Sequence, residues 1–167
     1  AKKIYKITDR IALTNAGSVG DSQVLIRFLR AQAKLYEAEH NRHITPRALA
    51  TFLSNVLNAN RLFPYMAQFI VGGFVDKPAL IEVSPYGDLI ERERFALSGS
   101  GTHLALAILD SDYKKDMSKE QAIELAVKAI SASKKRDIYT GGKRISVVVI
   151  TEKCPVCGKS REEIEKR

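Results

Sequence analysis

The sequence predicts an α+β fold in which two layers of helices cover a core of antiparallel strands. Segments with helical and strand-like patterns come in groups, in the order β-β-α-α-β-β-β-α-α-β, instead of alternating one by one. The chain has 167 residues, 45% of them hydrophobic, and at this size roughly 70% of the unfolded surface can be buried. Because no repeat or proline-rich linker divides the chain, we expect a single domain over residues 1–153. A loop and a short charged helix are expected over residues 154–167.

The first half of the chain is expected to form two strands and then two long helices. Residues 3–7 and 10–15 are strand-like, and from Asp21 onward pairs of apolar residues recur at helical spacing. The second helix is expected to begin at Thr45-Pro46, because the hydroxyl can cap free amides and proline has no amide to satisfy there. The apolar residues expected to be buried on the first helix are Val24, Leu25, Phe28, Leu29, Leu35 and Tyr36.

Three strands are expected in the middle of the chain, followed by a pair of helices and a last strand. The expected strands are 67–74, 79–83, 89–97 and 145–151. A helix from Thr102 to about Tyr113 follows a glycine-rich turn, and Ser118 and Gln121 have the spacing of a capping box that starts the next helix. The residues of that helix expected to point inward are Ile123, Val127 and Ile130.

The composition indicates a basic globular protein. Lys and Arg total 27 against 19 for Asp and Glu, a formal net charge of +8. The basic residues lie in short clusters broken by acidic ones and have no interleaved aromatic motif, so a solvated surface is favoured over a nucleic-acid-binding face. No apolar run reaches the roughly 18 residues of a membrane-spanning helix. Two cysteines cannot form a disulfide framework, and a cytoplasmic location is therefore expected.

Cys154 and Cys157 have the spacing of a zinc knuckle, but they supply only half of the four ligands of a structural zinc site. The ten residues after Cys157 contain no further cysteine or histidine. A distant histidine or a neighbouring subunit could complete the site, and a local disulfide or two free thiols are the alternatives. We expect no tightly bound zinc in the isolated chain. One equivalent of zinc that survives dialysis would contradict this expectation.

Four polar segments have small-residue neighbours that ordinary packing does not require. They are Lys3, Asn15-Ala16-Gly17, 98–101 and 136–142. Each segment alone is typical of a turn or a cap. Together they supply a lysine, a glycine amide, a serine and an Asp/Thr pair, which suits acyl transfer because the amide can receive an oxyanion and the side chains can orient a base. The set has no nucleophile with an adjacent base, and no phosphate loop, dinucleotide fingerprint or metalloprotease helix accompanies it.

Seven segments, in order along the chain, make the sequence resemble archaeal proteasome beta subunits. They are KKIYKI at 2–7, AGSVGD at 16–21, AQAKLYE at 31–37, LATFLSNVLNAN at 49–60, VGG at 71–73, GSGT at 99–102 and KRDIYTGG at 135–142. The resemblance implies the four-layer α-β-β-α sandwich of N-terminal nucleophile hydrolases, which agrees with the element order above. It also implies a threonine endopeptidase without a metal or organic cofactor.

In the family that the sequence resembles, the nucleophile is an N-terminal threonine whose own α-amine serves as the base. Ala1 aligns two residues before the family's catalytic lysine. The resemblance therefore implies that the first strands and the threonine are missing here and that this chain alone is inactive. The supporting residues that it implies are Lys3 for proton transfer, Gly17 for the oxyanion hole, Ser100 near the threonine amine, Asp137 as the supporting aspartate, and Thr140 in place of a serine.

The resemblance also implies a specificity pocket and partners. Asn15 and Val19 fall at positions that line the family's primary pocket, and the polar Asn15 predicts tolerance of polar P1 side chains.

The implied partners are other beta subunits in a seven-membered ring, alpha-type rings and unfolded polypeptides, with no membrane and no nucleic acid. Two alternatives stay open, a non-catalytic beta-type scaffold subunit and a small basic nucleic-acid-binding module that uses Cys154 and Cys157.

Overall fold

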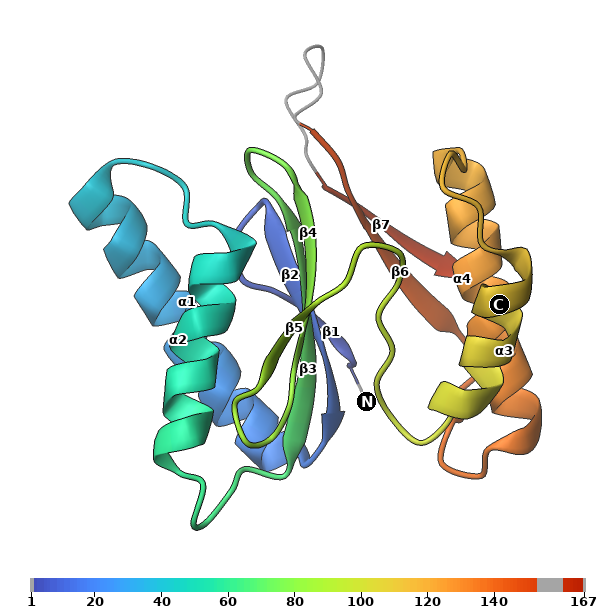
Figure 1. The fold of residues 1–167 in the computed structure, drawn as a ribbon, viewed down its shortest axis with the longest axis horizontal. Helices are drawn as coiled ribbons and strands as arrows, with labels where there is room; N and C mark the ends of the chain where they lie inside the picture. The colour runs from blue at the N-terminus through green and yellow to red at the C-terminus, as the bar shows by residue number, and fades with distance from the viewer. Residues whose placement is uncertain (1, 153–160, 167) are drawn as a thin grey trace.

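The computed structural model describes residues 2–152 and 161–166, which form four layers (Figure 1). One pair of helices covers a five-stranded sheet, and a second pair lies beyond a two-stranded sheet on the opposite side. The expected α+β arrangement, with helices outside and strands inside, is confirmed. None of the described helices is long and apolar enough to cross a membrane.

The larger sheet has five antiparallel strands, which neighbour one another in the order in which they occur in the chain. They are β1 (Ile4–Lys6), β2 (Ile11–Gly17), β3 (Ala67–Phe74), β4 (Pro78–Val83) and β5 (Leu89–Glu91). β2 pairs with β3 from Ile11 opposite Gly73 to Gly17 opposite Ala67. Alternate residues of β3, including Phe69, are fully buried, as expected of a sheet with one face on a core.

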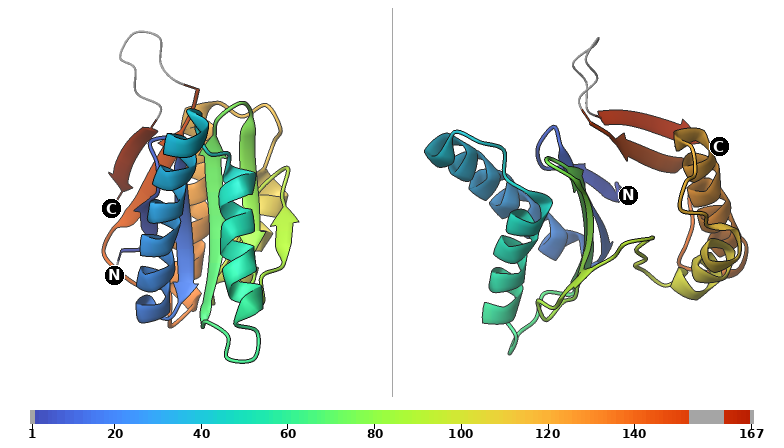
Figure 2. Two further views of the ribbon diagram at one scale, coloured as in Figure 1. Left: turned by 90° about the vertical axis from the view of Figure 1, so that its left-hand side faces the viewer. Right: turned by 45° about the horizontal axis from the view of Figure 1, so that its top comes forward.

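Helices α1 (Val19–His40) and α2 (Pro46–Ala59) cover one face of this sheet and lie side by side (Figure 2). The Ser18 hydroxyl caps α1 by accepting from the amide of Asp21 at 3.3 Å. Thr45 caps α2 in the same way, at 3.2 Å from the amide of Ala48, so the expected start of α2 is confirmed. The main core lies between these helices and the sheet, and its helical members include Leu25, Leu29, Leu49, Leu53 and Leu57.

The buried faces of two helices agree only in part with those expected. Leu25 and Leu29 of α1 are buried, and Phe28 and Tyr36 pack against the core, as expected. Val24 and Leu35 of α1 are 46% and 51% exposed, and Ile130 is 41% exposed. The residues that face inward include small polar or apolar ones, namely Ser22 and Ala33 on α1 and Ala129 and Ser133 on the fourth helix. Small residues let a helix approach its neighbour closely. Packing therefore selects a face that hydrophobicity alone does not identify.

The second half of the chain forms the other two layers. Its elements are α3 (Thr102–Asp112), α4 (Lys119–Arg136), β6 (Ile145–Ile150) and β7 (Arg161–Lys166). α3 and α4 pack on each other around a small core of Ala105, Leu109, Leu125 and Ala129. The expected capping box is confirmed, because the Ser118 hydroxyl accepts from the Gln121 amide and the Gln121 side chain accepts from the Ser118 amide.

The expected charged helix at the C-terminal end is wrong, since residues 161–166 form strand β7. It pairs with β6 over six positions, from Ile150 opposite Arg161 to Ile145 opposite Lys166. A helix this short is not stable by itself, whereas the edge of β6 offers it a complete set of backbone partners. Two ion pairs, Lys119–Glu162 and Arg144–Glu165, add to the attachment.

The expected strand 89–97 is correct only at its start, because β5 ends at Glu91. The Arg92 amide still donates to the Leu80 carbonyl of β4 at 2.8 Å, and the chain leaves the sheet after it. The Arg92 guanidinium pairs with Glu82 at 2.8 Å, and the other carboxylate oxygen of Glu82 accepts from the Leu97 amide. Phe95 and Leu97 then pack against the α3–α4 core. The segment thus crosses from the larger sheet to the second helical layer.

Candidate active site

The end of strand β2 is shaped by Gly17, whose φ of +119° favours glycine. A β-carbon at this position would lie 2.1 Å from the carbonyl oxygen of Met66, which no side chain tolerates. The Ser18 amide donates to the same oxygen at 2.6 Å and holds the two chain segments together. Gly17 itself is exposed, so another molecule can approach its backbone closely.

The turn at 98–101 lies against this strand end. A β-carbon on Gly99 would lie 3.7 Å from the β-carbon of Ala16, the residue before Gly17. The Thr102 hydroxyl donates to the Gly99 carbonyl at 2.6 Å and closes the turn at the start of α3. The exposed Ser100 is thereby held where the larger sheet meets the α3–α4 layer.

Asp137, the residue that ends α4, joins the serine and threonine predicted from the sequence. The Ser100 hydroxyl donates to its Oδ2 at 2.5 Å, and the Thr140 hydroxyl donates to the same oxygen. The Tyr139 amide donates to Oδ1 at 3.3 Å. These bonds, the one from Ser100 most of all, lower the pKa of the Asp137 carboxyl below its ordinary value of 3.8. The structure therefore brings three of the predicted site residues into one hydrogen-bonded group.

A buried contact behind this group fixes its position. The Ser133 hydroxyl donates to the carbonyl of Gly101 at 2.8 Å and so ties α4 to the start of α3. A β-carbon on Gly101 would lie 2.7 Å from that of Ser133 and 2.9 Å from the Thr140 hydroxyl oxygen. The sequence analysis did not identify Ser133. The available signal was its position four and eight residues after Ala129 and Leu125, on the same face of the helix.

We expect the acid sensitivity of folding to change when Asp137 is replaced by asparagine. A lowered folded-state pKa contributes stability above the unfolded value, and that stability is lost as the pH falls through the folded value. Asp137→Asn should thus be less stable than the wild type at pH 6, and the difference should shrink as the pH falls below 3.8. Urea unfolding at pH 6 and pH 3 measures this, with the exposed Asp110→Asn as the control. A difference that does not vary with pH would contradict the prediction.

Lys3 lies immediately before β1 and is exposed, whereas the sequence predicted it to lie inside a strand. Its carbonyl accepts from the Asn15 amide at 3.1 Å, which places Lys3 beside the end of β2. Lys3 also lines a cavity of about 360 Å³ between β1 and the β6–β7 pair.

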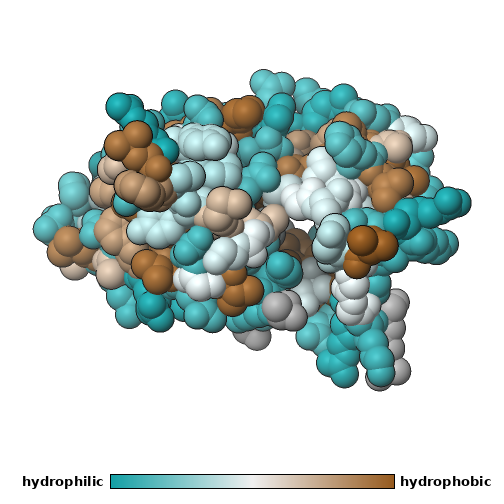
Figure 3. Space-filling model, turned by 90° about the horizontal axis from the view of Figure 1, so that it is seen from below, coloured by the Kyte–Doolittle hydropathy of each residue, from teal (hydrophilic) through white to brown (hydrophobic). Residues whose placement is uncertain are grey.

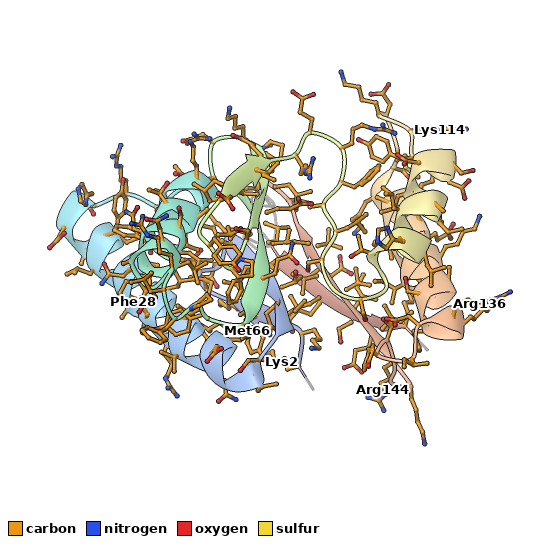
Figure 4. The ribbon with its side chains drawn as sticks, turned by 60° about the horizontal axis from the view of Figure 1, so that its bottom comes forward. Lys2, Phe28, Met66, Lys114, Arg136 and Arg144 are labelled. Carbon is orange, nitrogen blue, oxygen red and sulfur yellow. The ribbon has the colours of Figure 1, made fainter. Side chains whose placement is uncertain are left out.

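Figure 4 shows Met66, the residue that contacts the end of β2, in the middle of the molecule, between Phe28 in the helical layer and Arg136 at the end of α4. The strand end thus lies between the two halves.

Asn15 and Val19, predicted to line a specificity pocket, have opposite environments. Val19 is the first residue of α1 and is 47% exposed. Asn15 is 5% exposed, and its amide nitrogen donates to the Ser22 hydroxyl at 2.8 Å. Because Ser22 donates its hydrogen to the Ser18 carbonyl at 2.7 Å, Ser22 can only accept from Asn15. The Oδ1 atom of Asn15 is buried and accepts no hydrogen bond from any residue that the structure describes.

The part of the chain that the structure describes contains no cluster of three or more metal-ligating side chains. Cys154 and Cys157, the half zinc knuckle of the sequence, lie outside the described residues. The candidate site of the described residues is therefore a hydrogen-bonded group of polar side chains beside a glycine strand end.

The family profile described as proteasome subunit matches residues 1–150. The chain belongs to the proteasome subunit family. The resemblance predicted from the sequence is thus confirmed, together with the N-terminal nucleophile hydrolase fold class. The four layers described above, with helices outside antiparallel sheets, agree with that fold class.

Three relatives show that this proteasome chain is similar to the beta type. It is 52% identical to proteasome subunit beta 2 of Thermococcus gammatolerans and 49% identical to proteasome subunit beta 1 of Pyrococcus furiosus. Each match covers 90% of this chain and 75% or 76% of the relative. Proteasome subunit beta of Methanocaldococcus fervens is 45% identical over 99% of this chain and 74% of its own length. The beta-type function expected from the sequence is supported by all three.

Proposed function

We propose that this chain is a catalytic beta-type proteasome subunit that hydrolyses peptide bonds of unfolded proteins with a threonine nucleophile. The observation that carries the proposal is the convergence of Ser100 and Thr140 on one carboxylate oxygen of Asp137, beside the glycine strand end at Gly17. A subunit that served only as a scaffold would have no chemical use for this group. Metal ions and organic cofactors have no part in the proposed reaction.

Each polar residue has a distinct role in the proposed reaction. The backbone amide of Gly17 donates to the oxyanion that forms when the hydroxyl attacks the peptide carbonyl. Lys3 supplies positive charge that favours proton loss from the nucleophile. Asp137 is ionised at neutral pH, since its pKa lies below the ordinary 3.8, and it accepts the hydroxyl hydrogens of Ser100 and Thr140. The oxygens of these two hydroxyls can then accept a hydrogen bond from the base. The methyl group that distinguishes threonine from serine at position 140 does not prevent this contact.

We further propose that the chain assembles with other beta subunits in seven-membered rings stacked on alpha-type rings. Leu62, Phe63 and Met66, in the connection between α2 and β3, are 84%, 90% and 68% exposed. Seen from below, hydrophobic residues gather on the side of the molecule that carries this connection (Figure 3). Large exposed apolar side chains of this kind support burial against another protein. A cytoplasmic location stays a prediction from the cysteine content.

The test of the proposed function is made on active particles purified from the source organism. N-terminal sequencing and intact mass identify the first residue of the mature subunit, and threonine is expected. Substitution of that threonine by alanine should abolish hydrolysis of fluorogenic peptides without preventing assembly. Particles in which this subunit has another first residue, with peptidase activity confined to other subunits, would indicate the scaffold alternative instead.

We expect Asn15→Met to change the substrate preference of such particles. The Oδ1 of Asn15 is buried and has no hydrogen-bond partner among the described residues, so a polar P1 side chain would reach it through a bridging water. Losing one such bond should lower kcat/KM for polar P1 substrates by about tenfold relative to apolar ones. Ser22→Ala is the companion variant. It removes the hydrogen-bond acceptor of the Asn15 side-chain nitrogen and leaves the Oδ1 atom of Asn15 in place. A fluorogenic panel that Asn15→Met leaves unchanged would refute the assignment.

A further inference from the structure

A second cavity, of about 390 Å³, lies away from the candidate active site. It forms where the β1–β2 turn, the α1–α2 loop and the β3–β4 turn meet, at the top of the molecule in Figure 1. The charged side chains that line it are Arg10, Arg42, His43 and Asp76, and Tyr36 contributes an aromatic wall. The proposed peptidase chemistry uses none of these residues.

Arg10 is held firmly in one wall of this cavity. Its amide donates to the Thr8 hydroxyl at 3.2 Å, and its carbonyl accepts from the Phe74 amide at 3.0 Å. One guanidinium nitrogen, Nη1, donates to the Val75 carbonyl at 3.5 Å, and the side chain is half-buried. Arg10 has no carboxylate partner among the described residues, so most of its five N–H donors stay available.

Arg42 lines the same cavity and lies over the ring of Tyr36. Its guanidinium carbon is 5.7 Å from the centre of the Tyr36 ring, and that ring is itself stacked on His40 with centroids 4.3 Å apart. The stack restricts Arg42 without using its hydrogen-bond donors. Within the part of the chain that the structure describes, Arg42 also has no carboxylate partner.

The two arginines of the cavity suit an anionic ligand. His43 is engaged by Glu37 at 3.3 Å, and Asp9 on the neighbouring turn is paired with Lys6. Arg10 and Arg42 then carry two positive charges against the negative charge of Asp76, and Glu37 is balanced only when His43 is protonated. The carboxylates of Asp76 and Glu37 oppose a dianionic phosphate more than a singly charged carboxylate, which also matches the fork geometry of a guanidinium.

We propose that this cavity binds the carboxylate of an acidic side chain presented by a neighbouring subunit, with Arg10 and Arg42 as the two ligating residues. The choice of a protein carboxylate rests on the proposed function, in which a ring subunit faces other subunits on several sides. The resulting ion pair between subunits then fixes their relative orientation.

The binding part of the test uses the whole chain and three probes at constant ionic strength. N-acetyl-glutamate α-amide carries one side-chain carboxylate, N-acetyl-glutamine α-amide is its neutral match, and inorganic phosphate represents a small anion. The arginine Nε–Hε resonances of Arg10 and Arg42 should shift with the glutamate probe and not with the glutamine probe. Equal shifts with both amides, no shift with either, or phosphate binding tenfold more tightly than the glutamate probe would each overturn the proposal.

The assembly part uses Arg10→Gln and Arg42→Gln, with the exposed Arg27→Gln of α1 as the matched control. Each cavity variant should raise the dissociation constant of the assembled particle at least tenfold, and the control should not. Arg42 is exposed and packs on the Tyr36 ring, so its substitution tests the proposal even if Arg10→Gln folds poorly. Cavity variants that assemble like the wild type would overturn it. Peptidase activity per assembled particle should be unchanged, which separates this result from a failure of the proposed function.

Discussion

Gly17→Ala is expected to destabilise the protein by about 3 kcal/mol or more, because strain and a backbone clash act together. The added β-carbon would meet the Met66 carbonyl oxygen at 2.1 Å, and that oxygen cannot move away without breaking its bond to the Ser18 amide. The φ of +119° adds conformational strain for any residue with a β-carbon. The strand end must therefore separate from Met66 and Ala67.

Thermal and urea unfolding measure this loss, which should lower the melting temperature by roughly 6–12 °C for a chain of this size. Gly20→Ala is the matched control, since it lies three residues away and its β-carbon would meet only the Ser18 hydroxyl at 3.9 Å. The control should be neutral or stabilising, because alanine favours a helix more than glycine does. Equal stabilities of the two variants would show that the strand end adapts to a side chain.

Asp137→Ala is expected to lower kcat of the proposed enzyme by about 10²-fold or more, the usual scale for losing a group that supports proton transfer. The carboxylate is the common acceptor of the Ser100 and Thr140 hydroxyls, and both lose their orientation when it is removed. KM should change little, because none of these side chains belongs to the predicted specificity pocket. Steady-state kinetics on assembled particles give both constants.

The single variants Ser100→Ala and Thr140→Ala should each cost less than Asp137→Ala, since each leaves one hydroxyl on the carboxylate. Their effects should not add, because the three residues act as one unit. Asp110→Ala, on the exposed side of α3, is the control and should leave kcat unchanged. If Asp137→Ala matched this control, the proposed role of the carboxylate would be wrong.

The sequence predicted those features whose cause lies within a few residues along the chain. Thr45 before Pro46 and the Ser118–Gln121 pair satisfy amides three positions away along the chain, so their spacing alone predicts both helix starts. The family resemblance added candidate residues, and it was confirmed by the comparisons.

Contacts between distant segments account for what the sequence left open. Whether residues 161–166 form a helix or a strand depends on the free edge of β6, and whether 92–97 stays in the sheet depends on Glu82. Ser100 and Asp137 are 37 positions apart in the sequence and are joined by a hydrogen bond. Asn15 hydrogen-bonds to Ser22 because α1 packs on β2. Propensity and periodicity describe a segment and its nearest neighbours. Hydrogen bonds and close packing across layers depend on the assembled fold, because only folding brings residues that are far apart in the sequence within contact distance.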